Sequence, residues 1–222
     1  NQGKLTYSFT GDTHASLAKI TANLGKDWIF LETLYRIYSI SGYNIAHVDV
    51  TAKLCKDNDI RPENIDRIEA VVNWLETQYP SPAFAVRRED TNRKPGSTAY
   101  HLAYAAIKRG FPMLGDWAPQ SSRADDPPEV MALTNRVTII PSPIMTLFGP
   151  RITIFTKDGK SHTLQGTGRE FIWDFEEEAR RIRGIDPGLP IPVAQYESII
   201  EACRTLDHQP RADALVKLML KK

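Results

Sequence analysis

The strongest constraint on the fold is an Asp-Gly pair at the centre of Lys157-Asp158-Gly159-Lys160, which separates two runs of strand-like composition. Asp-Gly tolerates the positive φ angles of a tight hairpin turn, so the flanking runs are expected to pair antiparallel. Two other runs are also rich in β-branched and apolar residues. The four strand candidates are Ile68–Trp74, Arg136–Ile140, Arg151–Thr156 and Ser161–Gln165.

Helical patterns alternate with these strands, and this predicts an α+β fold in which a small antiparallel sheet is backed by helices. Apolar periodicity and capping residues locate the helices. Gly110 is expected to end one of them, and Ala118 to Pro128 is expected to be a loop. The predicted helices are Thr13–Leu24, Ala46 to about Lys56, Ser97 to about Arg109, and Glu170–Arg183.

Two amphipathic helices are predicted after the Pro/Gly-rich connection that spans residues 184–192. One presents Tyr196, Ile199, Ile200 and Cys203, and the other presents Ala212, Leu215, Val216 and Met219. A two-helix tail has little core of its own, so these apolar stripes need a further surface to bury against. The chain also begins at Asn1 rather than at Met. We therefore expect a fragment, or one half of a split enzyme, whose helical body continues outside this sequence.

Composition excludes several classes of protein. The chain has 222 residues, 41% of them hydrophobic and 25% charged, and a formal net charge of +1. This balance favours neither nucleic acid nor an anionic membrane as a partner. Cys55 and Cys203 do not form a metal-binding or redox motif, and the histidines lack metal-ligand spacing, so we expect no metal and a cytoplasmic protein. No apolar run is long enough for a transmembrane helix.

Seven stretches in a fixed order carry a family resemblance. They are Arg36-Ile37-Tyr38-Ser39; His47-Val48-Asp49; Thr77-Gln78-Tyr79-Pro80-Ser81-Pro82; Ser97-Thr98-Ala99-Tyr100 with Ala103-Tyr104 and Arg109-Gly110; Lys157-Asp158-Gly159; Thr167-Gly168-Arg169-Glu170-Phe171; and Pro187-Gly188-Leu189-Pro190-Ile191-Pro192. Together they cover nearly the whole chain and resemble the MmgE/PrpD family, which includes 2-methylcitrate dehydratase, cis-aconitate decarboxylase and iminodisuccinate epimerase.

The resemblance implies an all-helical domain, an inserted α/β lid, and an active site between them. On this basis residues 1–27 are the end of an N-terminal helical region, residues 28–165 are the lid, and residues 166–222 return to the helical domain. The N-terminal helical region, which supplies several acid, base and histidine groups in the family, would be missing from this chain. Family members are usually homodimers.

Two groups are candidates for substrate binding. Arg36 lies where the family commonly has a lysine in a Lys-x-Tyr/Phe-Pro turn, and its guanidinium can hold a carboxylate with two hydrogen bonds. Ser39 replaces the proline of that turn, and arginine does not readily give up a proton. Ser97 is expected to cap the helix that follows it, and the exposed N–H groups of that first turn could receive an anion. The alternative for Arg36 is an ordinary surface arginine.

Two groups are candidates for catalysis. Tyr79 falls near an active-site tyrosine of the family, and a phenol that stays protonated at neutral pH can donate to a developing enolate oxygen. His47 can contact substrate or shuttle a proton. The alternatives are an aromatic anchor for Tyr79 and a structural role for His47. Asp49 is expected near a helix start, where the helix dipole explains it, and Tyr100, His101 and Tyr104 are expected in the core.

The resemblance therefore implies the C-terminal part of a cofactor-independent lyase or isomerase that acts on a small polycarboxylate such as 2-methylcitrate or cis-aconitate. The chemistry would begin with removal of a proton next to a carboxylate. Dehydration, decarboxylation and epimerisation all remain open. We expect the chain alone to be inactive, because the main base would come from the helical part. The alternative is a non-catalytic lid and dimerisation module that complements a separate subunit.

Overall fold

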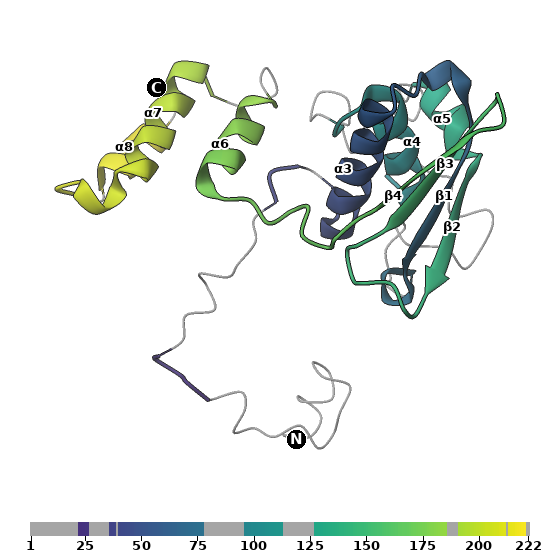
Figure 1. The fold of residues 1–222 in the computed structure, drawn as a ribbon. Coiled ribbons are helices and arrows are strands. Elements are labelled where there is room, and N and C mark those ends of the chain that lie inside the picture. The colour runs from purple at the N-terminus through teal and green to yellow at the C-terminus, as the bar shows by residue number, and fades with distance from the viewer. Residues whose placement is uncertain are drawn as a thin grey trace. The chain divides into compact units, whose positions relative to one another are not determined.

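The computed structural model describes residues 22–26, 36–38, 40–77, 96–112, 127–185, 191–211 and 213–220 (Figure 1). The chain divides into two compact units, residues 1–35 and 36–222. Within the first unit, residues 22–26 form a turn in which Lys26 N donates to Asn23 O at 2.8 Å. The helix predicted over Thr13–Leu24 lies mostly outside the described residues. The predicted domain limits at residues 27 and 165 stay predictions.

The second unit is α+β, as predicted, and is built on a four-stranded sheet in the order β2-β1-β3-β4 (Figure 1). The strands are β1 Ile65–Asn73, β2 Val137–Ser142, β3 Arg151–Thr156 and β4 Ser161–Gln165. The predicted hairpin is confirmed, because β3 and β4 pair antiparallel with Ile152 opposite Leu164. Gly159 in the turn has a φ of +83°. This positive angle favours glycine because a side chain would be strained there.

The prediction of a purely antiparallel sheet was wrong in one pair. β1 pairs antiparallel with β3 but parallel with β2, with Ile68 opposite Val137. The reason is the connection between β1 and β2, which includes helices α4 (Thr98–Lys108) and α5 (Pro128–Thr134). A helical crossover returns the chain to the end of the sheet at which it started, so the next strand runs in the same direction.

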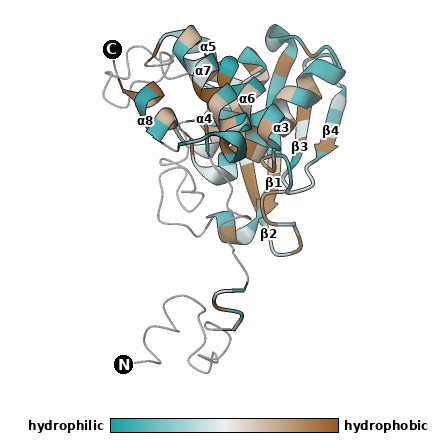
Figure 2. Cartoon of the chain, turned by 90° about the vertical axis from the view of Figure 1, so that its left-hand side faces the viewer, coloured by the Kyte–Doolittle hydropathy of each residue, from teal (hydrophilic) through white to brown (hydrophobic). Residues whose placement is uncertain are grey.

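One face of the sheet packs against α3 (Gly42–Asp57) and α4. Side chains alternate along β1, so that Ile68, Ala70 and Val72 are buried in the main core. Leu54 of α3 and Leu102 of α4 face the same core. The hydrophobic residues of these strands are visible as brown segments of the sheet in Figure 2. Tyr100, His101 and Tyr104 are all buried, which confirms their predicted place in the core.

Three helix limits differ from the predictions. Helix α3 begins at Gly42, four residues before Ala46, so Asp49 lies in the middle of the helix and not at its start. The left-handed residue that ends α4 is Arg109, with a φ of 56°, and not Gly110. A guanidinium Nη2 of Arg109 donates to the carbonyl oxygen of Ile60 at 3.2 Å, which helps hold this cap.

Helix α6 runs from Phe175 to Arg183 and therefore begins five residues later than predicted. Asp174 is its N-cap and accepts from Glu177 N at 2.8 Å. The Glu170 carboxylate instead accepts from the backbone N–H of Gly168 at 3.0 Å, which keeps this residue in a turn. Helix α5 was not predicted, because Pro128 reads as the end of a loop, although proline is also favourable in the first turn of a helix.

Helices α7 (Val193–Arg204) and α8 (Asp213–Met219) follow α6. Tyr196 and Ile200 of α7 form a small core with Ala179 of α6, as the predicted stripe requires. On α8, Val216 is 57% exposed and Met219 is 63% exposed, whereas Ala212 lies outside the described residues.

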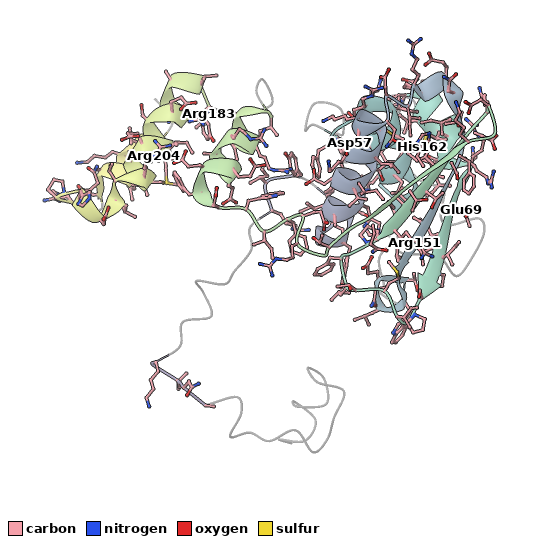
Figure 3. All side chains as sticks on the ribbon, in the orientation of Figure 1. Asp57, Glu69, Arg151, His162, Arg183 and Arg204 are labelled. Carbon is pink, nitrogen blue, oxygen red and sulfur yellow. The ribbon has the colours of Figure 1, made fainter. Side chains whose placement is uncertain are left out.

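Surface ion pairs also join these helices. Arg183 pairs with Glu197 at 2.7 Å and Arg204 with Glu176 at 2.9 Å (Figure 3). Within α6, Glu177 pairs with Arg181 at 2.7 Å, whereas the carboxylate of Glu176 accepts from Arg204 of α7.

Arg181 connects α6 to α3. Its two terminal nitrogens donate to the Asp49 carboxylate at 3.0 and 3.3 Å, and its Nε donates to Glu177 at 2.7 Å. The guanidinium carbon lies 4.4 Å from the ring centre of Trp173, within the range of a cation–π contact. We call this group of Arg181, Asp49, Glu177 and Trp173 the Arg181 latch.

No helix in the described part of the chain has the length and apolar composition needed to cross a bilayer.

Candidate functional site: a buried polar cluster

His47 lies on α3 with its side chain fully buried. Its Nδ1 is 2.5 Å from the carbonyl oxygen of Tyr43, one helical turn earlier. A carbonyl oxygen can only accept a hydrogen bond, so Nδ1 must carry the proton. In the neutral imidazole the other nitrogen, Nε2, then has a lone pair and acts as an acceptor.

Glu76 faces this second nitrogen. It belongs to a short 3-10 helix, Trp74–Thr77, that directly follows β1, and its side chain is 1% exposed. One carboxyl oxygen, Oε1, accepts from the backbone N–H of Phe148 at 2.8 Å. The other, Oε2, lies 3.3 Å from His47 Nε2. The two atoms are in contact, although their orientation in the structure is not that of a hydrogen bond.

Two further polar side chains are buried in the same region. Asn44 precedes His47 by three residues on α3 and therefore lies on the same side of the helix. His101 lies on α4, close enough for His47 to affect its pKa. Five buried atoms find no hydrogen-bond partner among the described residues: Asn44 Nδ2 and Oδ1, His101 Nδ1, His47 Nε2 and Glu76 Oε2. We call Asn44, His47, Glu76 and His101 the buried polar cluster.

Such a concentration of unpartnered polar atoms is rare, because each buried group without a partner costs about 1–3 kcal/mol. Proteins retain costly buried groups more often at functional sites than elsewhere. The cluster is therefore the candidate site that the described residues support best.

Burial sets the protonation states in the cluster. Desolvation lowers the pKa of His47 to about 4, opposed by its bond to the Tyr43 carbonyl and by the charge of Glu170. Desolvation likewise lowers the pKa of His101 to about 4. It raises the pKa of Glu76 to about 7, opposed by the N–H of Phe148. Near pH 6 both imidazoles are therefore neutral, and the Glu76 carboxyl largely retains its proton.

This arrangement is suited to proton transfer. A carboxyl group with a pKa close to neutral beside a neutral imidazole provides an acid and a base in contact. Within the described ranges, no three His, Cys, Asp or Glu side chains are placed to hold a metal ion together.

The other predicted site residues lie elsewhere or outside the described part. Arg36 is exposed, and its Nη1 donates to the Ile40 carbonyl at 3.0 Å, so it holds the turn that leads into α3. Ser97 is buried and caps α4, as predicted, by accepting from Tyr100 N at 3.1 Å. Tyr79 lies outside the described residues. The assignments of Arg36 and Ser97 to substrate binding, and of Tyr79 and His47 to catalysis, remain predictions.

Glu76 was not singled out from the sequence. Its neighbours Trp74 and Leu75 are 46% and 44% exposed, so the local pattern does not indicate burial of the third residue. Its partners come from α3 and from the loop before β3, far away in the sequence. No local signal could have identified it.

A separate feature of the surface is a hollow beside the β3–β4 turn. A depression of about 540 Å³ is lined by Arg67, Phe155, Lys157 and Lys160, among others. Two of these cations already pair with carboxylates: Lys160 lies 2.7 Å from Asp158, and Arg67 lies 3.4 Å from a neighbouring aspartate. These exposed pairs are typical of a solvated surface.

Comparison with known proteins identifies no relative of this chain. The chain matches no protein-family model, and a search of curated proteins returns no match. The MmgE/PrpD resemblance therefore rests on the sequence stretches alone.

Proposed function

We propose that this chain is the C-terminal part of a cofactor-independent lyase or isomerase of the MmgE/PrpD type, acting on a small polycarboxylate in the cytoplasm. The observation that supports this most is the contact between His47 and Glu76. Proton abstraction next to a carboxylate uses a positioned acid and base, and here a buried carboxyl with a pKa raised to about 7 lies beside a neutral imidazole.

In the proposed reaction a base removes a proton from the carbon next to a substrate carboxylate, and the electron pair moves into that carboxylate as an enediolate. Positioned cations and hydrogen-bond donors stabilise the new charge. Arg36 would hold a substrate carboxylate, and Tyr79 would donate to the enediolate. Loss of hydroxide, which leaves as water once protonated, would complete dehydration, and return of the proton to the opposite face would complete epimerisation. In decarboxylation, carbon dioxide would leave in place of the proton, its electron pair would form the same kind of enediolate, and protonation of that carbon would complete the reaction.

The test combines this chain with its N-terminal helical part and assays 2-methylcitrate and cis-aconitate. We expect turnover in the complete protein, none in this chain alone, and a loss of roughly 100-fold or more in Tyr79→Phe and Arg36→Ala. Lys53→Ala is the matched control for Arg36→Ala, because Lys53 is an exposed cation on the neighbouring helix α3. Unchanged activity in both site variants would remove these residues from the mechanism, and turnover by this chain alone would contradict the need for a helical partner.

A second candidate function is a non-catalytic lid or dimerisation module that completes another subunit. Exposed apolar residues favour it, namely Val216 and Met219 of α8 and Leu220 directly after the helix, because neighbouring apolar side chains this exposed are typical of a surface that packs against a partner. Sedimentation of the chain alone and mixed with the helical part separates the two functions. Association without turnover of any polycarboxylate would support the module.

A further inference from the structure

The contact between Glu76 and His47 determines where a proton lies inside the folded unit. Because the Tyr43 carbonyl fixes the Nδ1–H tautomer, His47 Nε2 presents a lone pair to Glu76 Oε2 at 3.3 Å. An ionised carboxylate facing a lone pair in a buried site would be repulsive, and within the described part of the chain no cation contacts either atom. The pair must therefore hold one proton, either on Glu76 or on His47 Nε2.

Placing that proton on His47 would create two buried charges, whereas placing it on Glu76 creates none. Burying an ion pair is costly unless additional hydrogen bonds satisfy both partners. Here the carboxyl group receives one backbone N–H, from Phe148, and the imidazole donates one bond, to Tyr43. The remaining titratable groups around the pair are His101 on α4, which is itself neutral, and Glu170, which acts on His47 from the segment before α6.

We propose that Glu76 is a positioning residue that keeps its proton through the weakly acidic range, where an ordinary carboxyl is ionised, and presents that proton to the neutral ring of His47. The Tyr43 carbonyl fixes the Nδ1–H tautomer, and Glu76 helps to hold the orientation of this imidazole, which the sequence analysis gave as a candidate for catalysis. The protonation state follows from the contacts alone. Its use in acid–base catalysis rests on the proposed function.

Glu76→Gln is the informative substitution, because the amide imitates the protonated carboxyl. Its N–H can donate to His47 Nε2 and its oxygen can accept from Phe148 N, so the fold should be retained. The matched control is Glu69→Gln, the same chemical change at a partly exposed carboxylate on β1 that lies 3.4 Å from Arg67.

The first measurement is urea unfolding of the full chain and both variants across the acidic to neutral range. A carboxyl whose pKa is raised on folding keeps a proton that the unfolded chain has released, so its contribution to stability falls as the pH rises from the unfolded pKa to the folded one. The pKa of Glu76 rises from 4.5 to about 7. The unfolding constant of the wild type should therefore increase relative to Glu76→Gln by about tenfold per pH unit over this interval. The same ratio measured against Glu69→Gln gives the baseline for removing a partly exposed carboxylate.

The second measurement does not depend on a variant. Nitrogen-15 NMR of the wild type should show His47 protonated on Nδ1 and bare on Nε2 from about pH 5 to about pH 7, in keeping with its depressed pKa. An imidazolium at His47 in this range would place the proton on the ring and overturn the proposal, as would unfolding curves of wild type and Glu76→Gln that stay parallel with pH. Neither measurement uses turnover, so the proposed function can fail while this inference stands.

If the complete enzyme is active, the same variant also tests the role of the proton. Glu76→Gln preserves the position of His47 but cannot transfer a proton. We expect kcat to fall and the limb of the pH profile assigned to Glu76 to disappear, with KM little changed. A wild-type profile in the variant would show that Glu76 has no part in the proton transfer.

Discussion

Replacing Arg181 by Met should detach α6 from α3 more effectively than any other single change in the C-terminal helices. The Arg181 side chain is 16% exposed and that of Asp49 is 23% exposed, so the pair is largely, but not fully, removed from water. Methionine retains much of the apolar length of arginine. The substitution therefore removes the charge and the hydrogen bonds more than it removes packing.

The contacts of Arg181 determine how much the substitution should lower the free energy of unfolding. Removing one partner of a fully buried pair costs about 3–5 kcal/mol, and the remaining exposure of both side chains reduces this figure. Loss of the cation–π contact with Trp173 adds about 0.5–1 kcal/mol. Glu177 keeps Arg180 as an ion-pair partner in the variant, so losing its contact with Arg181 adds little to the destabilisation. We expect a total loss of about 2–3 kcal/mol in the free energy of unfolding, or roughly 4–12 °C in Tm.

The stability lost in Arg181→Met should also depend on pH. Burial raises the pKa of Asp49, and Arg181 opposes that increase. Without Arg181 the folded-state pKa of Asp49 rises further, so the carboxyl is neutral and well tolerated in acid but must bury its charge as the pH rises. The difference between wild type and variant should therefore widen with increasing pH.

Urea unfolding provides the measurement, and Arg180→Met provides the control. Arg180 is the neighbouring residue on α6, its side chain is 67% exposed, and it forms an ion pair with the same Glu177. An exposed pair of this kind contributes about 0.2–1 kcal/mol. If Arg181→Met costs no more than Arg180→Met, the Arg181 latch does not hold α6, and the packing of Trp173 must do so instead.

Three shorter predictions test local features of the described residues. Ser97→Ala should lower the free energy of unfolding by about 1 kcal/mol, seen in urea denaturation, because it removes the side-chain cap of α4. Gly168→Ala should lower the melting temperature more than Gly159→Ala, although both positions have φ near +80°. An added Cβ at Gly168 would lie 2.7 Å from a loop carbonyl oxygen, whereas an added Cβ at Gly159 meets no atom within 4 Å. Equal melting temperatures of the two variants would contradict the proposed clash. In the native protein a thiol reagent should label Cys203 well before Cys55. Cys55 is buried, and desolvation raises the pKa of its thiol to about 12. Comparable labelling rates of the two cysteines would show that α3 opens readily.

Features that depend on neighbouring residues were predictable. The β3 and β4 limits, Arg151–Thr156 and Ser161–Gln165, agree with the sequence prediction because an Asp-Gly turn and strand composition act within a few residues. Ser97 as the cap of α4 was predictable for the same reason. The late start of α6 was missed because Asp174 and Glu170 are both suitable first-turn acids, and only their hydrogen bonds distinguish them.

The sequence alone therefore determined the fold class, the hairpin, most helices and His47 as a candidate, because each depends on local propensity, periodicity or a motif. Tertiary structure decided the parallel pairing of β1 with β2, the contact between Asp49 and Arg181, and the burial of Glu76 against His47 and Phe148. The Glu76 and Phe148 partners are 72 residues apart, and the Asp49 and Arg181 partners are 132 apart. Burial of a charged residue depends on which distant segments surround it, and no pattern of nearby residues encodes that.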